Sequence, residues 1–70
     1  MYYVMVDMRD EWGHVQSMRV GKPFKKSNSA MNLAKKYMNS NATVYKFGER
    51  IPLFTTNPKL MEIINALRIN

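Results

Sequence analysis

The chain has 70 residues, of which 11 are Lys or Arg and 5 are Asp or Glu, and its formal net charge at pH 7 is +6. This length predicts one small domain over residues 1–70, and the hydrophobic fraction of 46% is too high for a disordered chain. The absence of Cys and the single His exclude disulfides and argue against a structural zinc site. We expect no metal or cofactor, and a small core supplemented by a bound partner or by a homodimer.

The charges are segregated along the chain. No acidic residue lies between Trp12 and Gly48. The basic residues of this stretch, named here the basic block, are Arg19, Lys22, Lys25, Lys26, Lys35, Lys36 and Lys46. A surface of one sign attracts polyanions, so the basic block indicates nucleic acid or an acidic protein surface as the partner.

Nothing in the sequence indicates a membrane partner. The apolar run over residues 1–6 is too short for a signal peptide and has no basic start. No other stretch approaches the length of a membrane span. The lack of Cys is typical of a reducing compartment. We therefore expect a cytoplasmic location.

The beginning of the chain predicts a β-hairpin. Apolar side chains recur at alternate positions over residues 2–9, as in a strand with one buried face. Residues 10–13 predict the turn, because Gly13 can take a positive φ. Residues 15–20 predict the returning strand, which should end at residues 21–23.

The next segment changes to a helical period. Apolar residues fall on one side of a helix: Ala30, Met31, Leu33, Ala34, Tyr37 and Met38. Ser27 or Asn28 is expected to cap the N-terminus of this helix, and residues 39–41 are expected to end it.

Two further strands are predicted after the helix. The first covers residues 42–47, and Gly48-Glu49 fits a tight two-residue turn with Gly first. The second covers residues 50–54 and should lie at a sheet edge, because Pro52 has no N–H to donate.

The last segment predicts a second helix. Asn57 can cap it, and Pro58 loses no hydrogen bond at the first helical position. Its apolar stripe consists of Leu60, Met61, Ile63, Ile64 and Leu67. This helix either completes the core or serves as a dimer or partner helix.

The predicted order is β-β-α-β-β-α, which indicates the α+β class. A small antiparallel sheet with both helices packed on one face is the simplest way to bury these elements. The expected core includes Val20, Phe24, Phe47 and the methionines at positions 8, 18, 31, 38 and 61. Arg19 is expected to be exposed.

The chain also resembles a known group of proteins. Residues 23–27 lead from a hairpin into a helix that holds Ala30 and Ala34, and residues 44–53 follow as Val-Tyr-Lys-Phe-Gly-Glu-Arg-Ile-Pro-Leu. This architecture resembles many very small accessory and host-takeover proteins encoded by bacteriophages. The resemblance implies an inhibitor or modulator of a host machine. The same ββα order resembles small sheet modules that read DNA and some that bind RNA.

No constellation for catalysis is present. The serines are dispersed, and no Gly-rich loop is available to hold phosphate. His14 lies near Asp10 and Glu11, where a solvated turn explains it better than a metal or acid–base site. We expect a protein that is not an enzyme.

Two hypotheses remain for the function. In the first, a small basic protein engages nucleic acid, or a nucleic-acid-processing machine, through the basic block and the N-terminus of the first helix. In the alternative, a phage-type modulator binds a host protein through an aromatic and Met surface. Trp12, Tyr3 and Tyr45 are the candidate contact residues for this second role. Exposed aromatic rings can also stack on bases.

Overall fold

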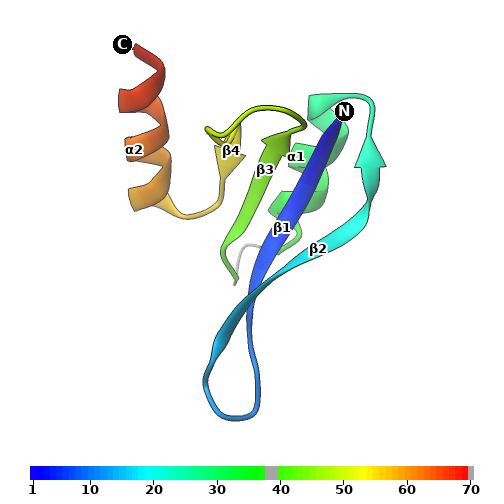
Figure 1. Ribbon diagram of the computed structural model, residues 1–70, viewed down its shortest axis with the longest axis vertical. Coiled ribbons are helices and arrows are strands. Elements are labelled where there is room, and N and C mark those ends of the chain that lie inside the picture. The colour runs from blue at the N-terminus through cyan, green and yellow to red at the C-terminus, as the bar shows by residue number, and fades with distance from the viewer. Residues whose placement is uncertain (38–39, 70) are drawn as a thin grey trace.

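The computed structural model describes residues 1–37 and 40–69 (Figure 1). Their elements, in chain order, are β1 (Tyr2–Arg9), β2 (Val15–Phe24), α1 (Ser27–Lys35), β3 (Ala42–Lys46), β4 (Phe54–Thr55) and α2 (Pro58–Ile69). The strands form one antiparallel sheet in the order β2-β1-β3-β4. The predicted α+β class and element order are confirmed.

The β1–β2 hairpin turns where the sequence predicts. Oδ1 of Asp10 accepts hydrogen bonds of 2.9 Å from the backbone N–H groups of Trp12 and His14. The N–H of Gly13 donates to the carbonyl of Asp10 over 3.1 Å, and Gly13 has a φ of 83°. This is a compact turn with a glycine in the left-handed region, as is common in short hairpin loops.

Strand β2 continues through the predicted stop at residues 21–23 and ends at Phe24. The proline in this range is tolerated because β2 lies at the sheet edge. Gly21 has a φ of 70°, and the pairing with β1 shifts register opposite residues 2–4. A Cβ on Gly21 would lie 3.0 Å from Cδ2 of Leu33. Glycine therefore serves both the irregular backbone and the close approach of α1.

Helix α1 packs on one face of the sheet and forms the core with it. The fully buried residues of this core are Val4, Val6, Ala30, Ala34, Ala42 and Val44. Alanine on the inner side of α1 lets the helix backbone approach the valines of β1 and β3 closely. Phe24, Met31 and Leu33 are partly buried and pack around the rim of this cluster.

The ends of α1 differ from their prediction. Lys26 occupies the N-cap position and makes no side-chain cap hydrogen bond, so the predicted cap at Ser27 or Asn28 is wrong. Phe24 packs against the core, and the chain turns into the helix soon after this anchor. The helix ends at Lys35. The predicted stop at residues 39–41 lies partly outside the described residues, and Met38 lies outside them entirely.

The connection from β3 to β4 is longer than the predicted two-residue turn. Gly48, with a φ of 87°, is the second central residue of a turn closed by a 3.1 Å hydrogen bond from the N–H of Glu49 to the carbonyl of Lys46. The chain then runs as a loop until the N–H of Leu53 donates to the carbonyl of Val44 over 2.8 Å. Pro52 cannot donate to the ladder, so pairing begins only after it.

Hydrogen bonds of threonine side chains connect β4 and the residue after it to β3. The buried hydroxyl of Thr43 donates to that of Thr55 over 3.2 Å. The hydroxyl of Thr56 accepts from the N–H of Ala42 over 3.0 Å and donates to the carbonyl of Ser40 over 3.1 Å. These bonds supply the pairing that a strand of two residues lacks.

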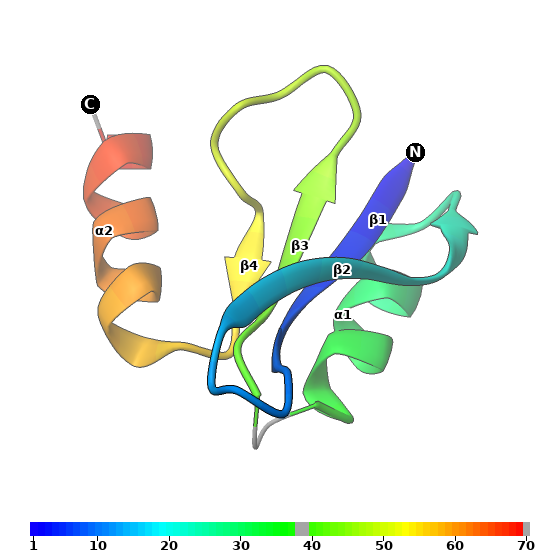
Figure 2. The same cartoon turned by 60° about the horizontal axis from the view of Figure 1, so that its bottom comes forward.

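Helix α2 lies beside the edge strand β4, away from α1 (Figures 1 and 2). The expectation that both helices pack on one face is therefore wrong for α2. The α1 face is already covered by α1, and the chain leaves β4 at the outer edge of the sheet. Leu60 of α2 instead lines a groove on the opposite face, together with Tyr3 and Tyr45.

The predicted cap of α2 is confirmed. Oδ1 of Asn57 accepts hydrogen bonds from the N–H groups of Lys59, over 3.0 Å, and Leu60, over 3.3 Å. The predicted apolar stripe of this helix is buried only in part. Ile64 is fully buried, whereas Ile63 is 56% exposed.

The hairpin projects beyond α1 (Figure 1). Met8 and Met18 are 38% and 51% exposed, so their predicted place in the core is wrong. Their strand alternation points them to the helix side of the sheet, but α1 does not reach this part of the hairpin. Val20 is half-buried, and Arg19 is exposed as predicted.

Ile64 and Ile63 test whether α2 belongs to the cooperative fold. We expect Ile64→Ala to lower the free energy of unfolding by about 2–5 kcal/mol, because it empties a buried site. Ile63→Ala makes the same substitution at an exposed neighbour and should change it by no more than about 0.5 kcal/mol. Urea unfolding followed by circular dichroism measures both. Equal effects would mean that α2 is not anchored through Ile64.

Candidate functional site

The sheet face opposite α1 is open only in part, because Ser17 and Arg19 are exposed there whereas Thr43 is buried. Strand alternation and the observed register place side chains of β1, β2 and β3 next to one another on this face. We name it the open face and define it by Tyr3, Met5, Asp7, Ser17, Arg19, Thr43 and Tyr45. These residues and Leu60 line an open groove of about 450 Å³.

Three aromatic rings gather at one end of the open face. The rings of Tyr3 and Tyr45 are stacked, with centroids 5.3 Å apart and an interplanar angle of 15°. The ring of Phe47 lies 4.8 Å from that of Tyr3 at 43°. We name Tyr3, Tyr45 and Phe47 the aromatic cluster. The guanidinium carbon of Arg19 lies 4.6 Å from the centroid of Tyr3 and 5.5 Å from that of Phe47.

Phe47 corrects one prediction about the core. It was expected inside, yet its side chain is 46% exposed. It follows Tyr45 by two residues, and a hydrogen bond of 2.9 Å from its N–H to the carbonyl of Met1 continues the pairing of β3 with β1. Strand alternation therefore carries Phe47 to the same side as Tyr45. The alternation of side chains along this strand was the signal in the sequence that could have placed Phe47 on the side of Tyr45.

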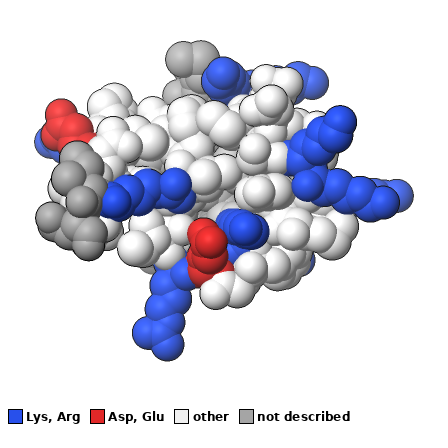
Figure 3. All heavy atoms as spheres, turned by 90° about the horizontal axis from the view of Figure 1, so that it is seen from above, with Lys and Arg blue, Asp and Glu red and all other residues white. Residues whose placement is uncertain are grey.

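The structure divides the basic block among several places. Lys25 and Lys26 precede α1, whereas Lys35 and Lys36 lie at its other end. The nine residues of α1 separate these pairs by about 13 Å. Figure 3 likewise shows basic side chains projecting from separate places and few acidic ones between them.

Three members of the basic block lie on strands. Arg19 belongs to the open face, against the aromatic cluster. Lys22 is exposed on the edge strand β2. Nζ of Lys46 lies 4.0 Å from a carboxylate oxygen of Glu49, and both side chains are exposed. Arg19 is thus the predicted nucleic-acid residue whose cation lies over the rings of the aromatic cluster.

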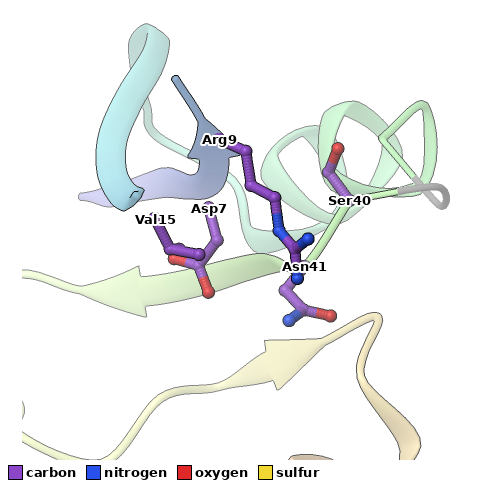
Figure 4. Close-up of a pocket in the computed structure, with 5 residues that line it drawn as sticks. All are labelled: Asp7, Arg9, Val15, Ser40 and Asn41. Atoms are coloured by element: carbon purple, nitrogen blue, oxygen red, sulfur yellow. The ribbon is translucent and has the colours of Figure 1, made fainter. Parts of the chain in front are cut away.

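Asp7 is the acidic residue of the open face. Its carboxylate accepts a hydrogen bond from the hydroxyl of Ser17 over 2.5 Å. Within residues 1–37 and 40–69, no Lys or Arg lies within ion-pair distance of it. Asp7 also lines a second pocket of about 450 Å³ with Arg9, Val15, Ser40 and Asn41 (Figure 4). The two pockets thus adjoin at Asp7.

Figure 4 shows how this second pocket is arranged. The side chain of Arg9 extends toward that of Asn41, while Asp7 and Val15 lie together on the other side. Arg9 follows Asp7 by two residues on β1 and so belongs to the same side of the sheet. Neither Asp7 nor Arg9 was among the candidate site residues named from the sequence.

The environment of Tyr45 keeps its hydroxyl neutral. Partial burial raises the pKa of Tyr45, and the nearby Tyr3 and the negative charge of Asp7 raise it further. Asp7 and Tyr45 line the same groove, so the carboxylate charge lies near enough to disfavour the charged form of the Tyr45 phenol.

Trp12 lies apart from the aromatic cluster. It occupies the hairpin tip and is 78% exposed, so its indole is accessible to a partner. Val15 and Met18 on the returning strand are 57% and 51% exposed. The three predicted protein-contact residues therefore form two separate surfaces, with Trp12 on one and the tyrosines on the other.

Other kinds of site find little support in the described part of the chain. No group of three or more His, Cys, Asp or Glu side chains there could hold a metal ion. Nδ1 of His14 lies 3.5 Å from Oδ2 of Asp10 in an exposed turn. No helix among the described residues has the length and apolar character needed to cross a bilayer.

Comparisons with protein-family models, with curated proteins and with solved structures found no match for this chain. Its function is therefore argued from the geometry and charge of the open face.

Tyr45 can be tested by alkaline titration. Subtracting the tyrosinate absorbance of Tyr45→Phe from that of the parent should leave a transition with a midpoint above the ordinary value of 10.0. Because the pKa of Tyr45 is higher in the folded state than in the unfolded state, this residue contributes its full stabilisation below the unfolded-state pKa. The contribution is lost as the pH rises through the folded-state pKa. Above that range, the parent should therefore lose more stability than Tyr45→Phe.

The denatured protein supplies the control for this titration. In concentrated urea the difference spectrum should show an ordinary tyrosine transition, because both burial and the neighbouring groups are removed. A midpoint in the folded protein at or below the denatured value would contradict the described environment of Tyr45.

Proposed function

We propose that the open face binds single-stranded nucleic acid. The observation that carries this proposal is the aromatic cluster, in which the exposed Phe47 and Arg19 lie against half-buried tyrosines on the open face of an antiparallel sheet. Stacking of bases on aromatic side chains of a sheet, with basic residues near the backbone, is a recurrent mode of single-strand binding.

The energies of the competing contacts favour a bound base. In the free protein the guanidinium of Arg19 covers Tyr3. An exposed cation–π contact contributes about 0.5–1 kcal/mol, whereas a base stacked on an aromatic ring contributes about 1–3 kcal/mol. A base can therefore replace the guanidinium over the rings. Arg19 then turns to a phosphate, which accepts charge-assisted hydrogen bonds from it.

The form of the surface favours a single strand over a duplex. The rings of the aromatic cluster need access to the flat surface of a base. In a duplex, neighbouring bases cover these surfaces and only the base edges are open in the grooves. Bases of a single strand can be splayed onto the protein instead.

The remaining positive charge supports the proposal at longer range. The net charge of +6 attracts a polyanion from all sides of so small a molecule, whose shortest extent is 20 Å. Electrostatic attraction acts over roughly 8–10 Å at ordinary ionic strength. Lysines on α1 and β2 therefore aid encounter even where they do not touch the bound strand.

Phe47 gives the most direct test of stacking. Phe47→Ala should weaken binding roughly 5- to 150-fold, which corresponds to the loss of about one stacked base. Trp12→Ala is the matched control, because it also removes an exposed aromatic ring but does so at the hairpin tip. Fluorescence anisotropy with labelled oligouridine and oligothymidine of about ten nucleotides measures the affinities.

Two outcomes of this experiment would reject the proposal. The first is that the parent binds neither oligonucleotide at low salt. The second is that Phe47→Ala binds as tightly as Trp12→Ala and the parent, which would separate binding from the aromatic cluster.

Charge reversal at the start of each helix tests the basic block. Lys26 occupies the N-cap position of α1, beside Lys25, whereas Lys59 lies in the first turn of α2. Lys26→Glu should weaken binding more than Lys59→Glu. It should also reduce the steepness of the plot of log affinity against log salt concentration, by about 0.7 in slope for each phosphate that the variant no longer neutralises. Equal weakening by both variants would mean that the basic block acts only through total charge.

The hairpin tip favours a second candidate function, which is protein binding. The exposed Trp12 and the apolar side chains of Val15 and Met18 lie on an arm that projects from the sheet (Figure 1). Exposed indole rings and flexible methionine side chains are both typical of protein contacts. A modulator of a host enzyme, as the likeness to small phage proteins implies, would use such an arm.

A pull-down from bacterial lysate with nuclease separates the two functions. Trp12→Ala should lose a protein partner that the parent retains after nuclease treatment, and Phe47→Ala should retain it. If nuclease releases everything that the parent captures, the protein-binding function is rejected.

A further inference from the structure

We infer that Asp7 makes the open face selective for guanine among the bases of a single strand. The inference rests on the proposed function, because it names the base that the groove prefers. It is carried by the position of a half-buried carboxylate in the groove that begins at the aromatic cluster.

The carboxylate of Asp7 has unused capacity to accept hydrogen bonds. An ionised carboxylate offers about four lone-pair sites, and the hydroxyl of Ser17 occupies one of them. In the described residues no cation pairs with Asp7, although the chain as a whole carries an excess of cations. A partly desolvated acceptor of this kind gains most from a ligand that brings N–H donors.

Guanine is the base that presents the matching donors. Its Watson–Crick edge carries two adjacent donors, N1–H and the 2-amino group, which can pair with both oxygens of a carboxylate. Uracil and thymine flank their single N–H with carbonyl oxygens, which a carboxylate repels. Adenine and cytosine each place a ring-nitrogen acceptor beside their amino group. The edge is free only in a single strand, which agrees with the proposed function.

The groove connects stacking to this edge. Asp7 follows Tyr3 by four residues on the same face of β1, which is about 13 Å along the strand. Met5 and Thr43 line the groove between them. Tyr45 lines the same groove as Asp7, and the charge of Asp7 contributes to the raised pKa of the Tyr45 phenol. A purine packed along Tyr45 therefore directs its Watson–Crick edge to Asp7.

Base substitution in the ligand tests the inference on the unmodified protein. The first probe is a tract of uridine or of thymidine, whichever the parent binds more tightly. The second probe is the same tract with one central guanine, and the third has inosine in place of that guanine. Guanine should bind roughly 5- to 150-fold more tightly than the plain tract, as expected for a bidentate contact. Inosine lacks the 2-amino group and should fall between them.

A variant then assigns the preference to Asp7. In Asp7→Asn the ratio of guanine to inosine affinity should fall to about one, since the second oxygen becomes an amide donor. Glu11→Gln removes the same charge in the exposed hairpin turn and should keep the parental ratio. Ratios are compared because neutralising any acid strengthens nucleic-acid binding in general.

A spectroscopic readout covers the case in which Asp7→Asn does not fold. The side-chain carboxyl carbon of Asp7 in the parent should shift in the NMR spectrum with the guanine probe and much less with the inosine probe. Binding without a guanine preference, an unchanged ratio in Asp7→Asn, or an unmoved Asp7 resonance would overturn the inference and leave the proposed function standing. Absence of binding to every probe would remove both.

Discussion

The pairing of β1 with strands on both of its sides is the constraint on which the structure depends. Val4 and Val6 are completely buried under α1, and burying such side chains stabilises the fold by about 1.5–3 kcal/mol each. Because side chains alternate, a register slip of one residue would expose both valines and bury Tyr3 and Asp7. The hydrophobic core on one face thus fixes the order of the polar and aromatic side chains on the other.

The place of α2 keeps the open face accessible. This helix contacts the sheet mainly through β4, and Ile64 supplies its fully buried side chain. Asn57 fixes where the helix begins, and the Thr55 hydroxyl accepts a hydrogen bond of 3.2 Å from the N–H of Asn57. A short, well-bonded link between β4 and α2 therefore directs the helix along the sheet edge. Only its first turn, through Leu60, reaches the groove.

Local patterns in the sequence were sufficient for the elements whose signals are local. Alternation predicted β1, and the Asn57-Pro58 pair predicted the start of α2. The errors arose where distant segments decide. The hairpin extends past the end of α1, so Met18 is not covered by this helix and is 51% exposed. Pro52 was assigned to a strand, although pairing begins only after it.

The candidate site was predicted in fragments. Arg19 was named for nucleic acid and Tyr3 for protein contact, but no local pattern shows that they lie 4.6 Å apart. Their contact follows from the register of β1 against β2, which depends on the turn and on the bulge at Gly21. Asp7 was not chosen as a site residue, since an acidic residue in a hairpin strand becomes distinctive only once its neighbours in space are known.

Positive charges along the free edge of β2 also protect this strand from aggregation. An unpaired edge strand of 10 residues is a template on which other chains can add strands and aggregate. Here Arg19, Lys22 and Pro23 lie along that edge, and the left-handed Gly21 interrupts its regular geometry. Under the proposed function, substitutions that change the charge of β2 will therefore alter colloidal behaviour and ligand affinity together.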